Sequence, residues 1–321
     1  MKNKYSIGIG LNLFDARAIL LRDDRKVIIE IEKKREHVNA NETIAVLLDL
    51  FEGIVSKAKQ YKECIEGVGL ALGGIVDNTK GVVHWPQKHN SSYTYISVPL
   101  KTYLEKKFGF PVTLENDANG CAWAEYTSHF PKSRNLVYMF SGVGCGIVVD
   151  GHLYRGKNGG AGELFINQQK MMSSSLGEFK FLRQWPVDLG MVKRAKELIS
   201  RGRVSSLIKK ITSTGDLALA DIFAEGAKKD KLSREVLKEA AFSLGVKIAF
   251  LTNLLNPEVV VIGGGLEAAG EVFLDECSDT VKSFAFSEMR SNLKIVASQT
   301  GKNATSLGAA AIIFREKSLQ E

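Results

Sequence analysis

Three glycine-rich turns, each directly after an apolar run, are the segments of this sequence best suited to binding a ligand. They are LALGGIVD at 70–77, MFSGVGCG at 139–146 and VVVIGGGL at 259–266. At the carboxyl end of a strand, a glycine turn lets backbone N–H groups approach an anion with no Cβ in the way. None of the three fits the Walker P-loop or the dinucleotide fingerprint. They therefore predict either anion-binding edges or simple turns.

A polar pair, Asn116 and Asp117, lies in LENDANGCAWAE (114–125), between a predicted strand and a predicted helix. A carboxylate at the end of a buried strand can accept a proton from a substrate hydroxyl, and the neighbouring amide can hold another hydroxyl. The alternative is that Asp117 only caps the helix. A later loop, RGKNGGAGELF (155–165), ends near Glu163 and fits either a lid with a sugar-hydroxyl acceptor or a solvated hairpin.

The periodicity of the apolar residues predicts the elements that carry these turns. In both halves of the chain, strands alternate with glycine turns and helices, which indicates two α/β halves. The predicted strands are 5–11, 17–22, 67–76, 111–116, 135–140 and 258–263, and the run 26–36 is a candidate for one more. The predicted helices are 42–58, 98–108, several between about 186 and 256, and 305–317.

Length and composition are those of a folded protein with two domains. The chain has 321 residues, of which 45% are hydrophobic and 25% charged, and this excludes wholesale disorder. No apolar stretch reaches the ~18–20 residues that cross a bilayer, and we expect a cytoplasmic protein with no membrane partner. The net charge is +7, but basic and acidic residues are mixed, which argues against a nucleic-acid stripe. The four cysteines form no C-x-x-C pair and predict neither disulfides nor a thiolate zinc site.

Taken in order, four segments resemble the ROK family (repressors, open reading frames, kinases) of the actin and hexokinase superfamily. The segments are GLALGGIVD, LENDANGCAWAE, SGVGCGIVVDGHLYRGKNGGAGE and PEVVVIGGGLEAAG. The resemblance implies an α/β, two-domain actin/hexokinase-like (ribonuclease H-like) fold with a sugar cleft between the domains. It places the first domain at 1–117, completed by a C-terminal helix at 305–321, and the second at 118–304. Dimers are common in the family, so a homodimer is also compatible with the resemblance.

The same resemblance implies roles for individual residues. Asp117 matches the catalytic base that takes a proton from the sugar hydroxyl. Asn116 and Glu163 match sugar contacts, and Gly74 lies in a segment that lines the same pocket. The residues that match a phosphate-binding turn and a loop near the adenosine are Ser141, Gly142, Gly144, Gly263, Gly264 and Gly265. ATP and Mg²⁺ would be cofactors only of a catalytically active protein.

Three features of the family are missing from this sequence. The D-x-G-G-T phosphate turn reads G-L-N-L-F, with Gly10 at the aspartate position and bulky Leu13 and Phe14 near its end. Such side chains should crowd a phosphate. Ile166 replaces the histidine of the zinc motif, and MMSSSLGEFKFLRQW contains no cysteine, so we expect no metal site and no zinc. Family repressors begin with a helix-turn-helix, whereas this sequence opens on a predicted strand, so a nucleic-acid partner is not expected.

Three functions are compatible with the sequence. The first is a sensor or regulatory protein that binds a small-molecule sugar, a hexose or N-acetylhexosamine, and has lost or weak kinase activity. The second is an ATP-dependent, glucokinase-like sugar kinase with Asp117 as base and a rearranged phosphate site. The third is a regulator that acts on DNA through a basic surface. The sequence favours the first function, because Asn116, Asp117 and Glu163 are intact beside a degenerate phosphate turn.

Overall fold

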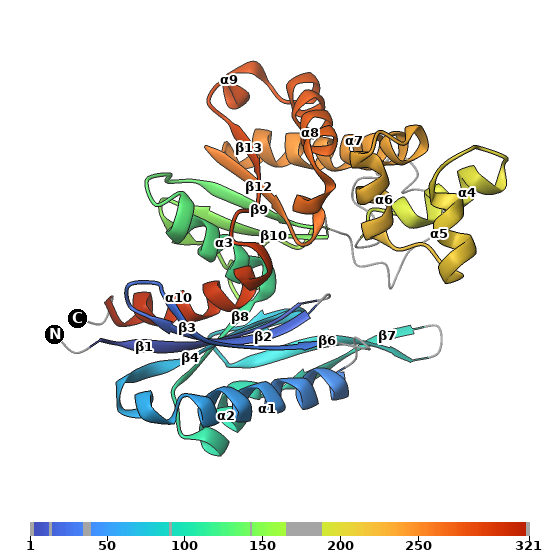
Figure 1. Cartoon of the computed structure of the whole chain (residues 1–321). Helices are drawn as coiled ribbons and strands as arrows, with labels where there is room; N and C mark the ends of the chain where they lie inside the picture. Colours follow the sequence, from blue (N-terminus) through green and yellow to red (C-terminus); the bar gives the residue numbers. More distant parts are fainter. Residues whose placement is uncertain are drawn as a thin grey trace. The chain divides into compact units, whose positions relative to one another are not determined.

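The computed structural model describes residues 3–12, 15–34, 40–89, 92–141, 143–164 and 188–318. Their strands form three sheets, with strand orders β3-β2-β1-β4-β8, β11-β10-β9-β12-β13 and β5-β6-β7 (Figure 1). Helices alternate with the strands along the chain, which confirms the predicted α/β class. No helix in the described part of the chain is long and apolar enough to span a bilayer.

The strands are β1 (Tyr5–Leu11), β2 (Asp15–Arg22), β3 (Val27–Lys34), β4 (Ile65–Leu72), β5 (Ile75–Asp77), β6 (Val82–His89), β7 (Ser92–Val98), β8 (Val112–Asn116), β9 (Leu136–Phe140), β10 (Gly144–Val149), β11 (His152–Leu153), β12 (Val259–Gly263) and β13 (Lys294–Ala297). The helices are α1 (Ala40–Lys57), α2 (Leu100–Phe108), α3 (Asp117–His129), α4 (Met191–Ser200), α5 (Leu207–Thr214), α6 (Leu219–Ala227), α7 (Lys231–Leu255), α8 (Glu271–Phe284), α9 (Ser287–Arg290) and α10 (Ala304–Ser318).

The first sheet places the polar pair at an edge where ligands commonly bind. β1 runs parallel to β4, and β4 runs parallel to β8, so the three strands end together. Leu72 at the end of β4 is in register with Leu11 on one side and with Asn116 on the other. Ligands of open α/β sheets bind outside the carboxyl ends of such strands.

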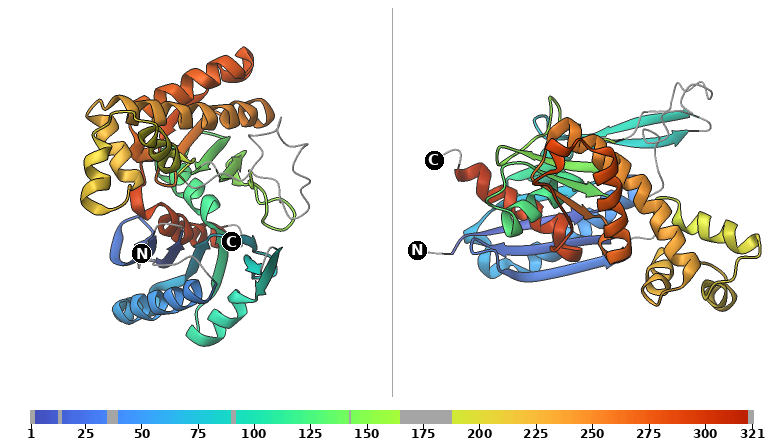
Figure 2. Two further views of the ribbon diagram at one scale, coloured as in Figure 1. Left: turned by 90° about the vertical axis from the view of Figure 1, so that its right-hand side faces the viewer. Right: turned by 90° about the horizontal axis from the view of Figure 1, so that it is seen from above.

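Helices cover both faces of this sheet: α1 and α2 lie on one face, α3 and α10 on the other (Figures 1 and 2). α10 packs backbone to backbone. A Cβ on Gly69 of β4 would overlap the backbone oxygen of Ala309, and a Cβ on Gly308 would overlap the backbone oxygen of Gly120 in α3. Glycine is therefore required at these positions by the close approach of α10 to its neighbours.

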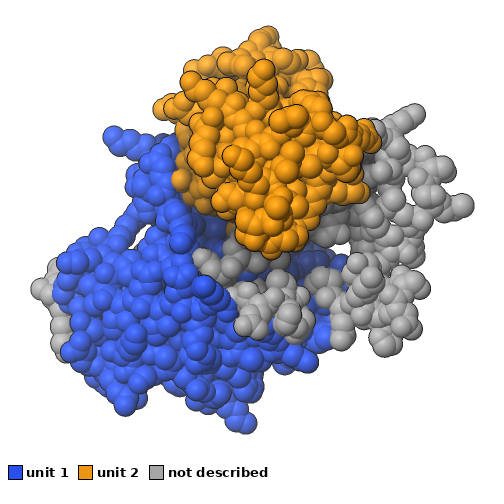
Figure 3. Space-filling model, turned by 45° about the vertical axis from the view of Figure 1, so that its right-hand side comes forward, with its two compact units in different colours: residues 1–134, 146–162, 299–321 blue, residues 135–145, 163–298 orange. Residues whose placement is uncertain are grey.

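The chain divides into two compact units, coloured separately in Figure 3. The first contains 1–134, 146–162 and 299–321, and the second contains 135–145 and 163–298. The sequence-based division ends the first domain at 117, whereas the first unit also includes α3 and residues 146–162, which contain β11 and all of β10 except Gly144 and Cys145.

The strands of the second unit run parallel: β12 pairs with β9 on one side and with β13 on the other. Gly263 at the end of β12 is in register with Phe140 at the end of β9. The glycine turns that follow these two strands are therefore neighbours at one edge. Buried valines and isoleucine of β12 form the centre of this sheet.

Candidate functional site

Asn116 caps helix α3. Its side-chain oxygen accepts hydrogen bonds from the backbone N–H groups of Ala118 (2.9 Å) and Asn119 (3.3 Å). Its amide nitrogen donates to the carbonyl of Gly74 at 3.2 Å. The alternative in which Asp117 serves as the N-cap is therefore wrong, because Asn116 occupies that position and Asp117 is the first helical residue.

The carboxylate of Asp117 is buried, with 7% of the residue exposed, and lies beside the first glycine turn. One oxygen accepts the N–H of Ala118 at 2.9 Å. The other lies 3.4 Å from the position that a Cβ of Gly73 would occupy. The N-terminal end of a helix stabilises negative charge, so the first turn of α3 is a favourable place for this carboxylate.

Trp85 holds the glycine turn in place. Its indole N–H donates to the carbonyl of Gly73 at 2.7 Å. Gly74 has φ = +116°, and a Cβ there would lie 2.9 Å from Trp85 Cδ1, so a larger residue would be strained and crowded. The sequence indicates Trp85 only as a packing residue beside a proline or as one that stacks on a sugar ring, because no spacing links it to residues 73–74.

The first unit thus brings together Gly74, Asn116 and Asp117 of the predicted sugar site. Glu163 belongs to the second unit, where it forms an isolated β-bridge with Gly144. The hydroxyl-binding chemistry available in the first unit is one buried carboxylate, one side-chain amide and the polar backbone of a glycine turn.

The second unit brings the predicted nucleotide residues Ser141 and Gly263–Gly265 together, but their polar groups already have partners. The N–H of Ser141 donates to Gly263 O at 3.2 Å, and its hydroxyl donates to the carbonyl of Gly264. The N–H of Gly264 donates to the Tyr138 hydroxyl at 3.2 Å. The N–H of Gly265 donates to the carboxylate of Glu267 at 2.8 Å. Gly142 lies outside the described residues.

The turns at Ser141 and Gly263–Gly265, as they are hydrogen-bonded here, do not form a good binding site for the phosphates of a nucleoside triphosphate. A phosphate cradle needs backbone N–H groups that point at the ligand, whereas those of Ser141, Gly264 and Gly265 are bonded within the protein. The carboxylate of Glu267 also adds negative charge beside the turn. Ser141 has φ = +48°, an uncommon value for a residue with a side chain. Its hydrogen bonds to the carbonyls of Gly263 and Gly264 hold it in this conformation.

The degenerate first turn is partly described. A Cβ on Gly10 would lie 2.7 Å from Ser306 N and 2.8 Å from Thr305 Cβ. An aspartate therefore does not fit at Gly10 unless α10 moves. Leu13 and Phe14, which should crowd a phosphate, lie outside the described residues. So do Ile166 and the run 171–185, on which the expectation of no zinc depends.

A buried lysine and a buried thiol lie near the second glycine turn. Lys247 of α7 is 3% exposed, and desolvation lowers its pKa to about 8. Burial, and to a lesser degree the charge of Glu163, raises the pKa of Cys145 to about 12. Lys247 is thus a charged group held in an apolar position, with the Cys145 thiol within electrostatic range. The periodic pattern of apolar residues does not single out either residue.

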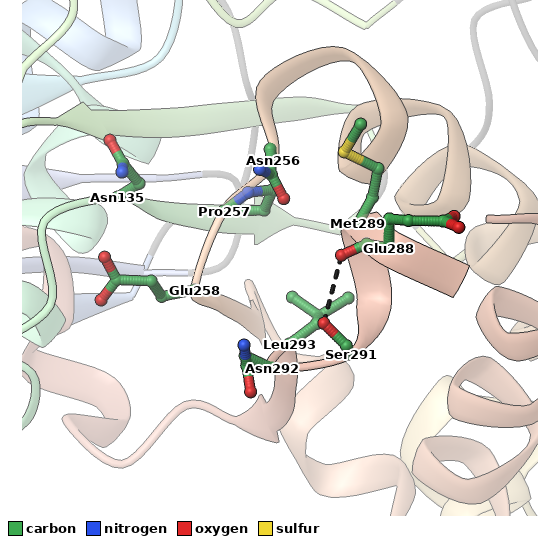
Figure 4. Close-up of a pocket in the computed structure, with 9 residues that line it drawn as sticks. All are labelled: Asn135, Asn256, Pro257, Glu258, Glu288, Met289, Ser291, Asn292 and Leu293. Carbon is green, nitrogen blue, oxygen red and sulfur yellow. Dashed lines mark hydrogen bonds between the residues drawn. The ribbon is translucent and has the colours of Figure 1, made fainter. Parts of the chain in front are cut away.

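One pocket of about 250 Å³ lies at the amino ends of the parallel strands of the second unit, at the other end of the sheet from the glycine turns (Figure 4). Asn135, Glu258 and Leu293 line it, and each directly precedes one of the parallel strands β9, β12 and β13. The predicted nucleotide residues follow the carboxyl ends of β9 and β12. This pocket is therefore separate from the predicted nucleotide site.

Comparison with known proteins defines the class of this chain. A glucokinase from Streptomyces griseus, solved with glucose and AMPPNP, superposes with a TM-score of 0.75 at 22% identity, covering 97% of this chain and 99% of that one. The fold is therefore the two-domain actin/hexokinase-like fold. The ROK family profile matches residues 5–316. The chain belongs to the ROK family.

Its curated relatives include both regulators and kinases. The xylose repressor of Caldicellulosiruptor bescii is 28% identical over 317 residues, which are 97% of this chain and 78% of the repressor. A glucokinase of Halalkalibacterium halodurans is 26% identical over 281 residues, which are 86% of this chain and 84% of the kinase. Because a repressor is among the relatives, the expectation of no nucleic-acid partner receives no support from the comparisons.

Proposed function

We propose that this chain is a sugar-binding sensor or regulatory protein of the ROK family, with lost or weak kinase activity. The ligand proposed is a hexose or N-acetylhexosamine. The observation that carries the proposal is the contrast between the two predicted half-sites. The carboxylate oxygens of Asp117 can each accept more than one hydrogen bond, whereas the single protons of the Ser141, Gly264 and Gly265 N–H groups are already donated within the protein.

In this proposal, Asn116, Gly74 and Glu163 bind sugar hydroxyls, and Asp117 accepts a hydrogen bond from one of them. Each carboxylate oxygen can accept more than one hydrogen bond, so Asp117 can accept a ligand hydroxyl in addition to the N–H of Ala118. A sensor needs no proton transfer, so in this function Asp117 contributes binding energy rather than rate.

The alternative is an ATP-dependent sugar kinase in which Asp117 takes the proton of the attacking hydroxyl. Two observations favour it. Asp117 is buried at a helix N-terminus, and within the second unit the turns at Ser141 and Gly264 lie next to each other. ATP and Mg²⁺ would supply the phosphoryl group and its charge neutralisation. The engaged N–H groups of the turns argue for a low rate.

Sugar titration and an ADP-release assay separate these functions. A Trp123→Phe/Trp185→Phe variant leaves Trp85, which contacts Gly73 and Gly74, as the only tryptophan reporter. We expect D-glucose, D-xylose or N-acetyl-D-glucosamine to change its emission. Asn116→Ala should weaken this binding at least 10-fold, whereas Asn292→Ala, an exposed asparagine of the second unit, should leave it unchanged.

Two results would contradict the sensor function. The first is no response to any of the three sugars at millimolar concentration. The second is steady ADP release that disappears in Asp117→Ala, which would establish the kinase. A gel-shift experiment on the same preparation tests the third function, and we expect no preference for one duplex over another at physiological salt.

A further inference from the structure

The carboxylate of Glu115, the residue before Asn116, is almost completely buried, with 1% of the residue exposed. One oxygen accepts a hydrogen bond from Arg155 Nε at 2.6 Å. The other accepts the Asn119 side-chain N–H at 2.9 Å and the backbone N–H of Asn116 at 3.0 Å. A buried carboxylate is costly without a cation and hydrogen-bond donors, and this one has both.

Arg155 connects that carboxylate to the glycine-rich loop. It lies two residues after Leu153, the last residue of β11, and its carbonyl accepts the N–H of Ala161, which closes the loop 155–161. Within the loop, a Cβ on Gly159 would overlap the carbonyl of Val76, so the loop backbone packs directly on β5. Its glycines therefore serve close packing and not only a solvated turn.

These contacts form a closed circuit in the first unit. β5 begins directly after Gly74, whose carbonyl accepts the side-chain N–H of Asn116. Asn116 is joined through its backbone N–H to Glu115, and Glu115 is joined to Arg155. The loop that begins at Arg155 then returns to β5. Each of these contacts restrains the next. Loss of the Arg155 cation should therefore increase the mobility of Glu115, Asn116 and the loop 155–161.

We propose that Arg155 is a positioning residue for the sugar site: through the Glu115 carboxylate, it holds Asn116 in place and keeps the 155–162 loop packed on β5. This role deepens the proposed function, because it concerns the residues assigned there to sugar hydroxyls. Arg155 acts through other residues and need not touch the ligand. Its side chain is 25% exposed, and its Nε lies 2.6 Å from the Glu115 carboxylate.

The test uses the full chain with four variants. Arg155→Met keeps an unbranched apolar stem and removes the cation, Glu115→Gln keeps the shape and removes the anion, and the double variant removes both. Lys157→Met is the matched control, because Lys157 is an exposed cation in the same loop. The readouts are amide hydrogen exchange of peptides covering 112–122 and 150–163, and the Kd for D-glucose, D-xylose and N-acetyl-D-glucosamine.

We expect Arg155→Met to raise exchange at least 10-fold in both peptides, with peptides of β12 and α7 unchanged, and to raise the sugar Kd at least 10-fold. Adding Glu115→Gln should restore part of the protection, because the uncompensated buried charge is then gone. Lys157→Met should match the wild type in both readouts.

Two results would overturn the positioning role. The first is an amide hydrogen exchange rate in Arg155→Met that equals the rate in Lys157→Met. The second is an exchange rate that rises uniformly in every peptide, because that indicates a general loss of stability. The exchange readout needs no sugar. A wild type that binds none of the three sugars therefore refutes the proposed function alone, while the exchange pattern still decides the role of Arg155.

Discussion

Burial of Lys247 should make a contribution to the free energy of unfolding that rises with pH between about 8 and 10.5. The folded state releases the proton of Lys247 at a pKa of about 8, whereas the unfolded state releases it at the ordinary value of 10.5. Between these values the unfolded chain binds a proton that the folded chain lacks, so the free energy of unfolding rises with pH. Each pKa unit is worth about 1.4 kcal/mol, and the full penalty below pH 8 is therefore about 3 kcal/mol.

Lys247→Met removes this penalty while keeping a side chain of similar length. At pH 7 the variant should be more stable than the wild type by an amount on the order of 3 kcal/mol, and the advantage should fall by about 2 kcal/mol between pH 8 and 9.5. The thiol of Cys145, whose pKa burial raises from 9.0 to about 12, stays protonated in the folded state but ionises above about pH 9 in the unfolded state. This lowers the stability of the wild type and of Lys247→Met alike, so it cancels in the difference between them.

Urea denaturation at pH 7.0, 8.0, 9.0 and 10.0 measures the difference between the wild type and Lys247→Met. Lys193→Met, at an exposed position of α4, is the control and should show no trend. A difference between Lys247→Met and the wild type that stays constant across these pH values would show that Lys247 keeps its proton when folded, and would refute the reasoning.

Two further predictions concern the first unit. Gly69→Ala should destabilise the protein by about 3 kcal/mol or more in thermal or urea unfolding, because its Cβ would overlap the backbone of Ala309. The control is Gly53→Ala in α1, whose Cβ would lie 3.3 Å from Ile31 Cδ1. An equal loss of stability in both variants would contradict the close approach of α10. The Thr79 hydroxyl and the Lys80 N–H lower the pKa of Asp77 to about 2, so its ionised form stabilises the fold above pH 3.8, and that stability is lost as the pH falls toward 2. Asp77→Asn should therefore cost about 2 kcal/mol at pH 7 and progressively less below pH 4; a cost independent of pH would exclude the ionised carboxylate as the cause.

The sequence predicts the parts of the candidate site that depend on local pattern. Apolar runs followed by glycines identify β4, β9 and β12, and parallel strands end at a common edge, so Asn116 and the glycine turns are found at carboxyl edges as expected. The family resemblance, confirmed by the profile match, supplied the identity of the residues. Neither source indicates which polar groups in the turns are already bonded.

The rest depends on contacts between distant segments. The ion pair of Glu115 and Arg155 joins residues forty positions apart, and no spacing rule predicts it. The β6–β7 hairpin was not predicted, because β6 contains Pro86 and many polar residues, which argue against a strand. The choice between Asn116 and Asp117 as N-cap is also undetermined by sequence, because both residue types cap helices well.

The first unit is assembled from three stretches of chain, and its last stretch contains α10, which packs against β1 and β4. During synthesis on a ribosome, the strands around Gly8 and Gly69 emerge long before the helix that covers them. Until then, α3 alone covers one face of the sheet, while all residues of the second unit, which ends at residue 298, have already been synthesised. Nascent chains halted near 300 should therefore recruit chaperones through the earliest strands, and release should depend on the arrival of residues 304–318.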